Sequence, residues 1–330
     1  MSQSPLAFIE KFAGENFVPR FKRFFVGVVE DFWKDAPLEQ SKLGAKIGKW
    51  KFARKIFGQG SISPQTMTTT KGPGTSVKSL WHAVPGEISE KMWGDGFVSP
   101  GTEVVAEWLT SSLGLSKDMN VLDLSAGLGG RMRSISEKYG VYITGLEPDP
   151  PIAARGMEMS VKAGKGKHDA IMAYDPNNFS QTKKYDCIIA RETLYRVDDK
   201  FRFLAAIAAA TKPKAQIAYT DYIVEVEDRD KPAIAAWRAF EKNAMPFSLA
   251  EATDAWQRVG FDLRTHEDKT DYYRKEVIGG LKRLAIHLAS GVRPDPETKA
   301  SILKRVQTWV HRVAAMEQGM KFYRLQAIKK

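Results

Sequence analysis

Residues 121–132, VLDLSAGLGGRM, decide the fold of this chain. An apolar run that enters a glycine-rich turn is typical of a strand followed by a helix in an α/β domain. Gly127 and Gly129 stand two residues apart, but the third glycine of a dinucleotide-binding turn would fall on Met132. The turn also lacks the Gly-Lys-Ser/Thr ending of a P-loop. The spacing therefore disfavours both a dinucleotide pyrophosphate and an ATP phosphate as the ligand.

Around this stretch, strand patterns alternate with helix patterns. We expect strands at 120–125, 141–148, 169–175, 185–192, 215–223, 261–267 and 320–328. Expected helices cover 130–140, 151–164, 200–212, 232–244, 249–259, 272–289 and 297–317. Such alternation implies right-handed crossovers and a parallel sheet that helices cover on both faces. The pattern therefore predicts an α/β, doubly wound fold.

The composition is that of a globular protein, with 43% hydrophobic and 11% aromatic residues. The chain has one cysteine, Cys187, so it cannot form a disulfide framework. No segment approaches the roughly 18 apolar residues of a membrane span. The histidines are not spaced as metal ligands, so we expect no metal site. These features favour a cytoplasmic protein.

The net charge of +11 is concentrated at the two ends of the chain. Residues 1–80 hold 13 Lys and Arg against 6 Asp and Glu, and residues 264–330 hold 15 against 7. A nucleic-acid enzyme would also carry basic charge around its active centre, so we expect no nucleic-acid partner.

The N-terminal part of the chain has a different character. Residues 20–34 place aromatic side chains at helical spacing beside basic ones, which suits an amphipathic helix that touches an anionic membrane surface. Residues 58–76 are rich in Gly, Ser, Thr and Pro and read as a linker. We predict a mostly helical N-terminal extension and linker at 1–77, which could form a homodimer or cover the site, and one globular domain at 78–330.

What remains of the glycine-rich turn is an acidic residue followed by small ones: Asp123, Ser125, Gly127 and Gly129. This pattern resembles the first motif of class I S-adenosylmethionine-dependent methyltransferases, with serine in place of the usual first glycine. The resemblance implies that the turn approaches the methionine part of S-adenosylmethionine.

Two further strand ends fit the same family. Glu147 ends the second expected strand, where an acidic residue can hold both ribose hydroxyls. AYDPNNFS at 173–180 resembles the family's segment after the third strand, which gives the adenine amino group to Asp175, beside Pro176. The three successive matches predict S-adenosylmethionine as the cofactor.

Two longer stretches narrow the resemblance. EKMWGDGFVSPG at 90–101 and ARETLYRVDDKFRFLAAIAAATKPKAQIAYTDY at 190–222 look like the phosphoethanolamine N-methyltransferases and related small-molecule methyltransferases. The resemblance covers about residues 78–328 and implies a Rossmann-like, seven-stranded sheet whose last strand is antiparallel. It also implies a loop that lids the cofactor, which carries over to Asp95, Phe97, Val98 and Ser99. We expect Val98, Ser99 and Arg191 to contact the cofactor.

The chain departs from this family at the catalytic pair, a histidine after the fourth strand and an upstream tyrosine. Arg196 stands at the histidine position, and Trp81 falls near the tyrosine position. Arginine stays protonated at neutral pH, so it cannot act as a general base. Glu192 and His82 become the candidate bases, and Arg196 becomes a candidate to bind a carboxylate or phosphate of the substrate.

Other aromatic residues are candidates for substrate binding. Tyr222 matches a phosphate-binding tyrosine of the family, and the ring faces of Trp93 and Phe97 could hold a cationic group. Each candidate has a structural alternative: core packing for the aromatic residues, a surface salt bridge for Arg196, and a cofactor contact or ordinary hydrogen bonding for Glu192.

The expected function is methyl transfer from S-adenosylmethionine to a small, anionic metabolite, with sulfur or nitrogen favoured as the acceptor atom. Two alternatives remain open at this point. One is methylation of a lipid at a membrane surface, suggested by residues 20–34. The other is a catalytically idle methyltransferase fold that serves as a binding or regulatory subunit, suggested by the missing histidine and by Ser125.

Overall fold

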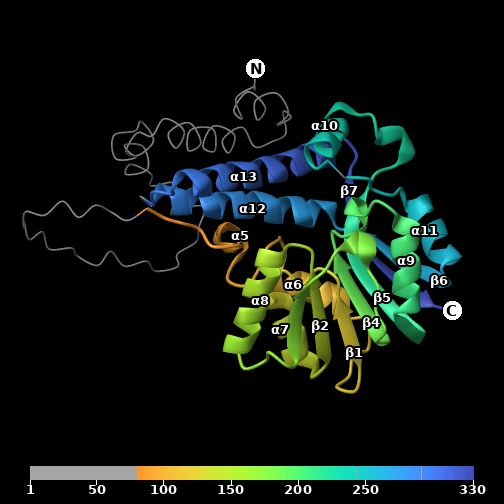
Figure 1. Cartoon of the computed structure of the whole chain (residues 1–330). Helices are drawn as coiled ribbons and strands as arrows, with labels where there is room; N and C mark the ends of the chain where they lie inside the picture. The colour runs from red at the N-terminus through yellow and green to blue at the C-terminus, as the bar shows by residue number, and fades with distance from the viewer. Residues whose placement is uncertain (1–79, 243, 291) are drawn as a thin grey trace, which may run out of the picture. The chain divides into compact units, whose positions relative to one another are not determined.

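The computed structural model describes residues 80–242, 244–290 and 292–330 (Figure 1). The predicted extension at 1–77, with its amphipathic segment 20–34 and its linker 58–76, lies outside the described residues. The chain divides into two compact units, one of residues 83–284 and 302–330, the other including His82 and Ala285–Ser301. The domain boundary expected near residue 77 stays a prediction.

The larger unit is built on a seven-stranded sheet with the order β3-β2-β1-β4-β5-β7-β6 (Figure 1). The strands are β1 (Asn120–Asp123), β2 (Tyr142–Glu147), β3 (Asp169–Ala173), β4 (Tyr185–Arg191), β5 (Thr211–Ile223), β6 (Phe261–Asp268) and β7 (Lys321–Lys329). β1 pairs in parallel with β2 and β4, whereas β7 runs antiparallel to both β5 and β6. The doubly wound sheet with an antiparallel last strand is confirmed.

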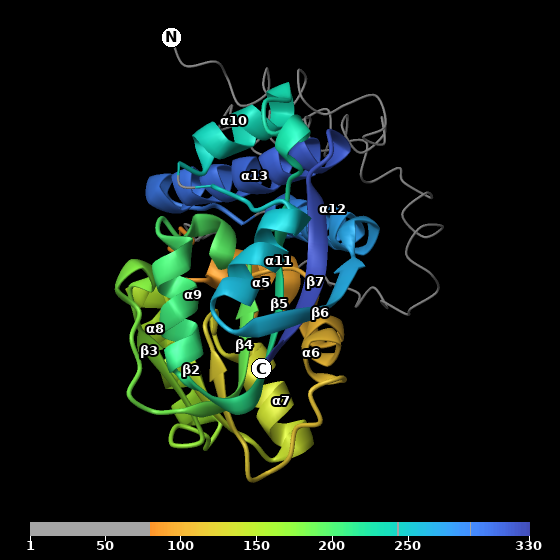
Figure 2. The ribbon, with the colours of Figure 1, turned by 90° about the vertical axis from the view of Figure 1, so that its right-hand side faces the viewer.

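Helices cover both faces of the sheet (Figure 2). One face carries α6 (Thr102–Thr110), α7 (Gly130–Tyr139) and α8 (Pro150–Lys162), and the other carries α9 (Lys200–Ala209) and α11 (Leu249–Arg258). Successive side chains of β1 point to opposite faces of the sheet. Val121 therefore packs in the core beneath α6, α7 and α8, and Leu122 packs in the core beneath α9 and α11. Burial on both sides explains why this strand is apolar at consecutive positions.

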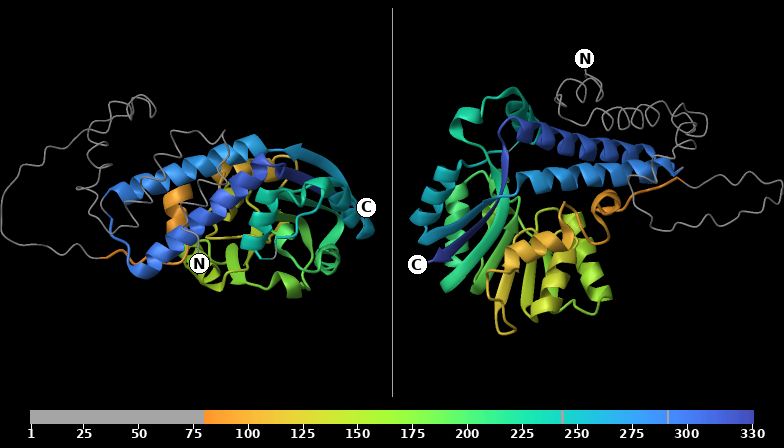
Figure 3. Two further views of the ribbon diagram at one scale, coloured as in Figure 1. Left: turned by 90° about the horizontal axis from the view of Figure 1, so that it is seen from above. Right: turned by 180° about the vertical axis from the view of Figure 1, so that it is seen from behind.

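Four further helices complete the described part of the chain: α5 (Glu87–Trp93), α10 (Pro232–Phe240), α12 (Thr270–Ala289) and α13 (Pro296–Glu317). Within the larger unit, the first part of α12 and the last part of α13 run side by side (Figure 3), and the ring centroids of Tyr273 and Trp309 lie 6.4 Å apart. None of the helices among the described residues is both long and apolar enough to cross a membrane.

Two glycines allow the turn, the helix and the sheet to approach closely. A Cβ on Gly145 in β2 would lie 2.4 Å from Sδ of Met132 in α7. The third glycine of a dinucleotide-binding turn is thus replaced by Met132, and Gly145 on the neighbouring strand provides the space. At Gly127, φ is +57° and a Cβ would lie 2.6 Å from Cγ2 of Val98, so this position requires glycine.

The expected elements agree with the structure to within a few residues, except between α9 and β5. The prediction of a helix to residue 212 is wrong, because α9 ends at Ala209 and β5 begins at Thr211. Pro213 disfavours helical backbone at the residue before it. Thr211 instead pairs with Tyr185 of β4, so the strand starts earlier than its apolar pattern indicates.

The two sides of α9 offer a test of this architecture. Leu204 is 0% exposed and Phe201 is 56% exposed. Leu204→Ala should lower the free energy of unfolding by about 2–5 kcal/mol, because it leaves a cavity in the core. Phe201→Ala on the same helix should change it by no more than about 0.5 kcal/mol. Urea unfolding followed by circular dichroism measures both variants, and equal losses would contradict the assigned face.

Candidate cofactor and acceptor site

The strand order places the site at the carboxyl ends of β1 and β4. The sheet continues to β2 and β3 on one side of this pair and to β5 on the other, so the order reverses there. In open α/β sheets, ligands bind in the crevice beyond such a switch point. Asp123 ends β1, Arg191 ends β4, and Glu192 follows Arg191. The glycine-rich turn and the segment after β4 therefore meet at one edge.

Asp123 holds the glycine-rich turn in place. Its Oδ1 accepts hydrogen bonds from the backbone N–H of Ser125 at 2.8 Å and from the Ser125 hydroxyl at 3.0 Å. Burial raises the pKa of Asp123, against the opposing effects of Ser125 and of the Arg191 charge. The serine that replaces the family's glycine thus ties the turn to the carboxylate before it. Gly129 is the N-cap of α7, with a φ of +80°.

Glu147 lies at the end of β2, beside the turn. Its carboxylate accepts from the backbone N–H of Gly127 at 2.9 Å and from that of Asp149 at 3.1 Å. Burial raises the pKa of Glu147 to about 7, although these two backbone hydrogen bonds lower it. Each oxygen accepts one backbone hydrogen bond and keeps further acceptor capacity, as a ribose diol requires.

Asp175 and Pro176 begin a short 3-10 turn, η2 (Pro176–Asn178), after β3. The Asp175 carboxylate accepts from the backbone N–H of Asn177 at 3.0 Å and from the side-chain amide of Asn178 at 2.5 Å. Asp175 is exposed and caps this turn. Its position at the end of the third strand agrees with the sequence-based expectation, and its carboxylate also has a structural role.

The loop between α5 and α6 packs directly on the glycine-rich turn. The backbone N–H of Gly130 donates to the carbonyl of Gly96 at 3.0 Å. A Cβ on Gly130 would lie 2.6 Å from that same carbonyl oxygen. Together with the contact between Val98 and Gly127, this close approach fits a loop that covers a ligand at the turn.

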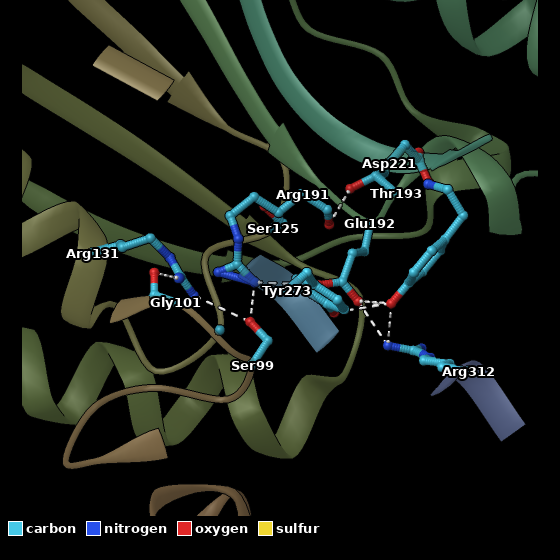
Figure 4. A network of polar contacts seen from close by, with 12 residues as sticks. Ser99, Gly101, Ser125, Arg131, Arg191, Glu192, Thr193, Asp221, Tyr273 and Arg312 are labelled. Carbon is cyan, nitrogen blue, oxygen red and sulfur yellow. Dashed lines mark hydrogen bonds and ion pairs between the residues drawn. The ribbon is translucent and has the colours of Figure 1, made fainter. Parts of the chain in front are cut away.

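Ser99 anchors the end of this loop between two arginines (Figure 4). Its buried hydroxyl accepts from Arg131 at 3.1 Å and also from Arg191. The Arg131 guanidinium lies 5.5 Å from the ring centroid of the half-buried Phe97, so one face of that ring is occupied. Among the described residues, Nη1 of Arg191 is buried without a hydrogen-bond partner. That free N–H suits the carboxylate of an amino-acid moiety.

Glu192 is strained and densely hydrogen bonded. Its φ is +49°, a conformation that costs a glutamate about 1–3 kcal/mol and that persists mainly at functional sites. Its Oε1 accepts from the hydroxyl of Tyr273 at 2.7 Å. Its Oε2 accepts from the hydroxyl of Tyr222 at 3.0 Å. The same oxygen accepts from Arg312 at 2.7 Å (Figure 4). Oε1, with Tyr273 as its one hydrogen-bond donor among the described residues, keeps an acceptor position.

Arg312 of α13 joins two carboxylates while being 2% exposed. Its Nε and Nη2 donate to Glu241 at 2.6 and 2.8 Å, and its Nη1 donates to Glu192 at 2.7 Å. Burial would raise the pKa of Glu241, but the charge and hydrogen bonds of Arg312 outweigh burial and hold that pKa well below its usual range. Nη2 also donates to the hydroxyl of Tyr195 at 2.6 Å, so this guanidinium is fully engaged.

The tyrosines of this cluster are buried hydrogen-bond donors. Burial raises the pKa of Tyr222 and of Tyr273 well above the ordinary value, despite the nearby charge of Arg312. Both therefore stay protonated at physiological pH. The ring of Tyr273 stacks on Phe322 with centroids 3.7 Å apart, and that of Tyr222 meets Trp237 at 5.5 Å.

Asp221 fixes the segment after Glu192. Its Oδ2 accepts from the backbone N–H of Leu194 at 2.7 Å and of Tyr195 at 3.2 Å, at the start of the short 3-10 turn η3 (Leu194–Arg196). Burial raises the pKa of Asp221 to about 7, against three backbone hydrogen bonds that lower it. This buried carboxylate thus positions Tyr195 for its contact with Arg312.

The other predicted site residues have diverse surroundings. Arg196 has a 56% exposed side chain, pairs with Glu241 at 3.2 Å and donates to the hydroxyl of Tyr195. The guanidinium of Arg196 is therefore already engaged by a carboxylate.

Trp93 is 3% exposed and packs edge-on against Trp309 with centroids 5.1 Å apart, which is a core position.

Trp81 and His82 belong to the smaller unit. His82 has a 75% exposed side chain, and its Nδ1 lies 2.5 Å from the Asp295 carboxylate. The ring of Trp81 meets that of His287 edge-on at 5.1 Å. Within their own unit these contacts are structural, and a catalytic role for either residue stays a prediction.

Sequence reasoning missed four members of the cluster around Glu192: Tyr195, Glu241, Tyr273 and Arg312. One signal was available. Arg312 interrupts the apolar run WVHRVAAM at 309–316, and a charged side chain is rarely buried on an apolar helix face unless it is paired. The partners of Arg312 could not be read in the same way, because they come from distant segments.

Comparisons with known proteins show the family to which this fold belongs. A family model described as a methyltransferase domain matches residues 100–266. Phosphoethanolamine N-methyltransferase 1 of Zea mays is 24% identical over 185 residues, which cover 56% of this chain and 36% of the maize protein. A sterol 24-C-methyltransferase of Neurospora crassa is 26% identical over 209 residues, 56% of this chain and 53% of that protein. The chain thus spans between about a third and a half of these relatives' lengths.

A solved structure has the same fold. Phosphoethanolamine N-methyltransferase 2 of Haemonchus contortus, in complex with phosphomonomethylethanolamine and S-adenosylhomocysteine, matches with a TM-score of 0.65 at 17% identity. The match covers 73% of this chain and 56% of the Haemonchus chain. Because the family model matches half of the sequence, the chain belongs to the methyltransferase family, whose methyl donor is S-adenosylmethionine.

Proposed function

We propose that this protein transfers a methyl group from S-adenosylmethionine to the nitrogen of a small amine that also carries an anionic group. The observation that carries the proposal is the carboxylate of Glu192. It follows the cofactor-side residue Arg191, its backbone is strained, and one of its oxygens keeps an acceptor position. The relatives named above act on phosphoethanolamine or on sterols, so the acceptor has to be argued from the site itself.

S-adenosylmethionine, when bound, supplies a methyl group on a positively charged sulfur. The residues at the turn fit this cofactor in type and position. Glu147 would accept the ribose hydroxyls, Asp175 and Pro176 would meet the adenine, and the free N–H of Arg191 would meet the methionine carboxylate. The remaining proposed contacts come from the turn and its covering loop: Asp123, Ser125, Gly127, Gly129, Val98 and Ser99.

On the acceptor side, the hydrogen-bonding capacity of Glu192 favours a nitrogen nucleophile. An amine N–H can donate to Oε1, which aligns the nitrogen and holds its lone pair toward the methyl group. A thioether has no N–H and would leave that position unused. Because three donors already satisfy Glu192, we assign it to orienting the amine rather than to removing its proton.

The surroundings of Glu192 favour a role in methyl transfer over a regulatory role. Tyr222 and Tyr273 are each 1% exposed, so their hydroxyls reach Glu192 without competition from bulk water. The strained φ of Glu192 is a cost that a purely structural or regulatory fold has no reason to keep. The lipid alternative depends on residues 20–34, and nothing in the described part of the chain favours it.

The proposed role of Glu192 predicts a selective loss of turnover. Glu192→Gln should lower kcat at least about tenfold, which corresponds to about 1.4 kcal/mol in the activation barrier. Its dissociation constant for S-adenosylhomocysteine should change less than about twofold, because the cofactor-side contacts remain. Mass spectrometry of a panel of amines incubated with isotope-labelled S-adenosylmethionine measures the transfer.

The control for this experiment is Glu227→Gln, which removes the same charge at an exposed position. It should behave as the wild type. Full activity of Glu192→Gln, or wild-type methylation of thiols and thioethers but of no amine, would contradict the proposal.

The raised pKa of Glu147 predicts a pH-dependent cofactor affinity. Above pH 7 the carboxylate is ionised and accepts both ribose hydroxyls, and as the pH falls through the pKa of about 7 it takes up a proton. By linkage, S-adenosylhomocysteine should bind about tenfold more weakly at pH 6 than at pH 8. Titration calorimetry checks this, and Glu147→Gln should bind weakly at both pH values with little slope. A wild-type affinity that is flat between the two values would refute the assignment of Glu147.

A further inference from the structure

Three arginines lie within electrostatic reach of Glu241, and two of them are already neutralised. Arg312 is enclosed by Glu192 and Glu241, with N–O distances of 2.6–2.8 Å. Arg196 pairs with Glu241 at 3.2 Å. An anionic group that entered the site would compete with these carboxylates for either guanidinium. The third arginine, Arg305, is in a different situation.

Arg305 lies on the same face of α13 as Trp309 and Arg312. Residues four and seven positions apart fall on one side of a helix, so the side chain of Arg305 stands two turns before that of Arg312. Arg305 is half-buried. In residues 80–242, 244–290 and 292–330 it has no hydrogen bond to another side chain and no ion pair within 4.0 Å.

The charges that act on Arg305 come from Arg312, Arg196 and Glu241 on the proposed acceptor side and from Asp149 on the proposed cofactor side. Asp149 follows β2 by two residues, and its carboxylate accepts from the backbone N–H of Ile152 at 3.2 Å as the cap of α8. Arg305 therefore lies within electrostatic reach of both the proposed cofactor edge and the cluster around Glu192.

The environment of Arg305 is unfavourable for an unaccompanied charge. Burial lowers its pKa, and the positive charges of Arg312 and Arg196 lower it further, although Asp149 and Glu241 act in the opposite direction. A bound anion would supply the hydrogen bonds and the countercharge that this guanidinium lacks.

We propose that Arg305 holds the anionic group of the acceptor, and that this group is a carboxylate. The inference rests on the proposed function, since it names the acceptor class for the same site. A single free guanidinium matches one carboxylate through two parallel hydrogen bonds. A phosphate monoester carries about −1.5 to −2 charges at neutral pH and would need a second cation. The other nearby arginines are committed elsewhere: Arg196 and Arg312 are bound to Glu241, and the free N–H of Arg191 is assigned to the methionine carboxylate of the cofactor.

The acceptor class is therefore a small amino acid or its N-methylated form. Its amine would donate to Oε1 of Glu192, and its carboxylate would bind Arg305. Methyl transfer forms the N–CH₃ bond and breaks the S–CH₃ bond. The nitrogen lone pair makes the new bond, the electrons of the old bond stay on sulfur, and a proton leaves the methylated nitrogen to solvent.

The test compares acceptors and variants with the full-length protein. Wild type is assayed by S-adenosylhomocysteine release with glycine, sarcosine, β-alanine and 4-aminobutyrate, and with phosphoethanolamine and ethylamine. One of the amino acids should have a kcat/KM at least about tenfold above those of phosphoethanolamine and ethylamine. Arg305→Gln should raise the KM for that amino acid at least about tenfold while kcat and the affinity for S-adenosylhomocysteine change less than about twofold.

Two further variants sharpen the test. Arg305→Lys should restore part of the lost affinity, because lysine keeps the charge but not the two-pronged geometry. Lys304→Gln removes one charge from the adjacent exposed position of the same helix and should behave as the wild type. If Arg305→Gln does not fold, the wild-type acceptor preference and Arg305→Lys still decide the question.

The outcomes separate this inference from the proposed function. Preference for phosphoethanolamine, equal use of ethylamine, or an unchanged KM in Arg305→Gln would overturn the inference while amine methylation stands. Failure of the wild type to methylate any amine, with S-adenosylhomocysteine binding intact, would overturn the proposed function and the inference together.

Discussion

The buried guanidinium of Arg312 makes the contacts on which the proposed acceptor side of this site depends. It satisfies Glu192 at the end of β4 and Glu241 after α10, and it also donates to the hydroxyls of Tyr195 and Tyr222. Removing one partner of a buried ion pair typically costs about 3–5 kcal/mol, because the other charge is left uncompensated. The placement of this part of α13 is therefore coupled to the positions of two carboxylates, Glu192 and Glu241.

Two adjacent residues at the end of β4, Arg191 and Glu192, contact the two sides of the proposed site. Arg191 binds Ser99 of the covering loop on the cofactor side, and Glu192 binds Tyr222, Tyr273 and Arg312 on the acceptor side. The left-handed backbone of Glu192 lets consecutive side chains serve the two sides, with Arg191 Nη2 and Glu192 Oε1 only 3.9 Å apart. The strained backbone of Glu192 is thus part of the geometry that brings the proposed methyl-donor and methyl-acceptor sites together.

The strand-end positions of the proposed cofactor residues could be predicted from sequence because their signals are local. Asp123, Glu147 and Asp175 each stand at or just beyond the end of an apolar strand, and parallel strands bring such ends to one edge. The acceptor side could not, because its contacts span long separations: Tyr273 lies 81 residues and Arg312 lies 120 residues from Glu192. The arginine at the family's histidine position was visible in the sequence, but its carboxylate partner Glu241 was not.

The most direct measurement is a crystal structure of the protein with S-adenosylhomocysteine. The account predicts that the ribose hydroxyls bond to Glu147, that the sulfur faces Glu192, and that Arg312 keeps its bonds to Glu192 and Glu241. Ribose hydroxyls bound elsewhere, or a sulfur turned away from Glu192, would contradict it.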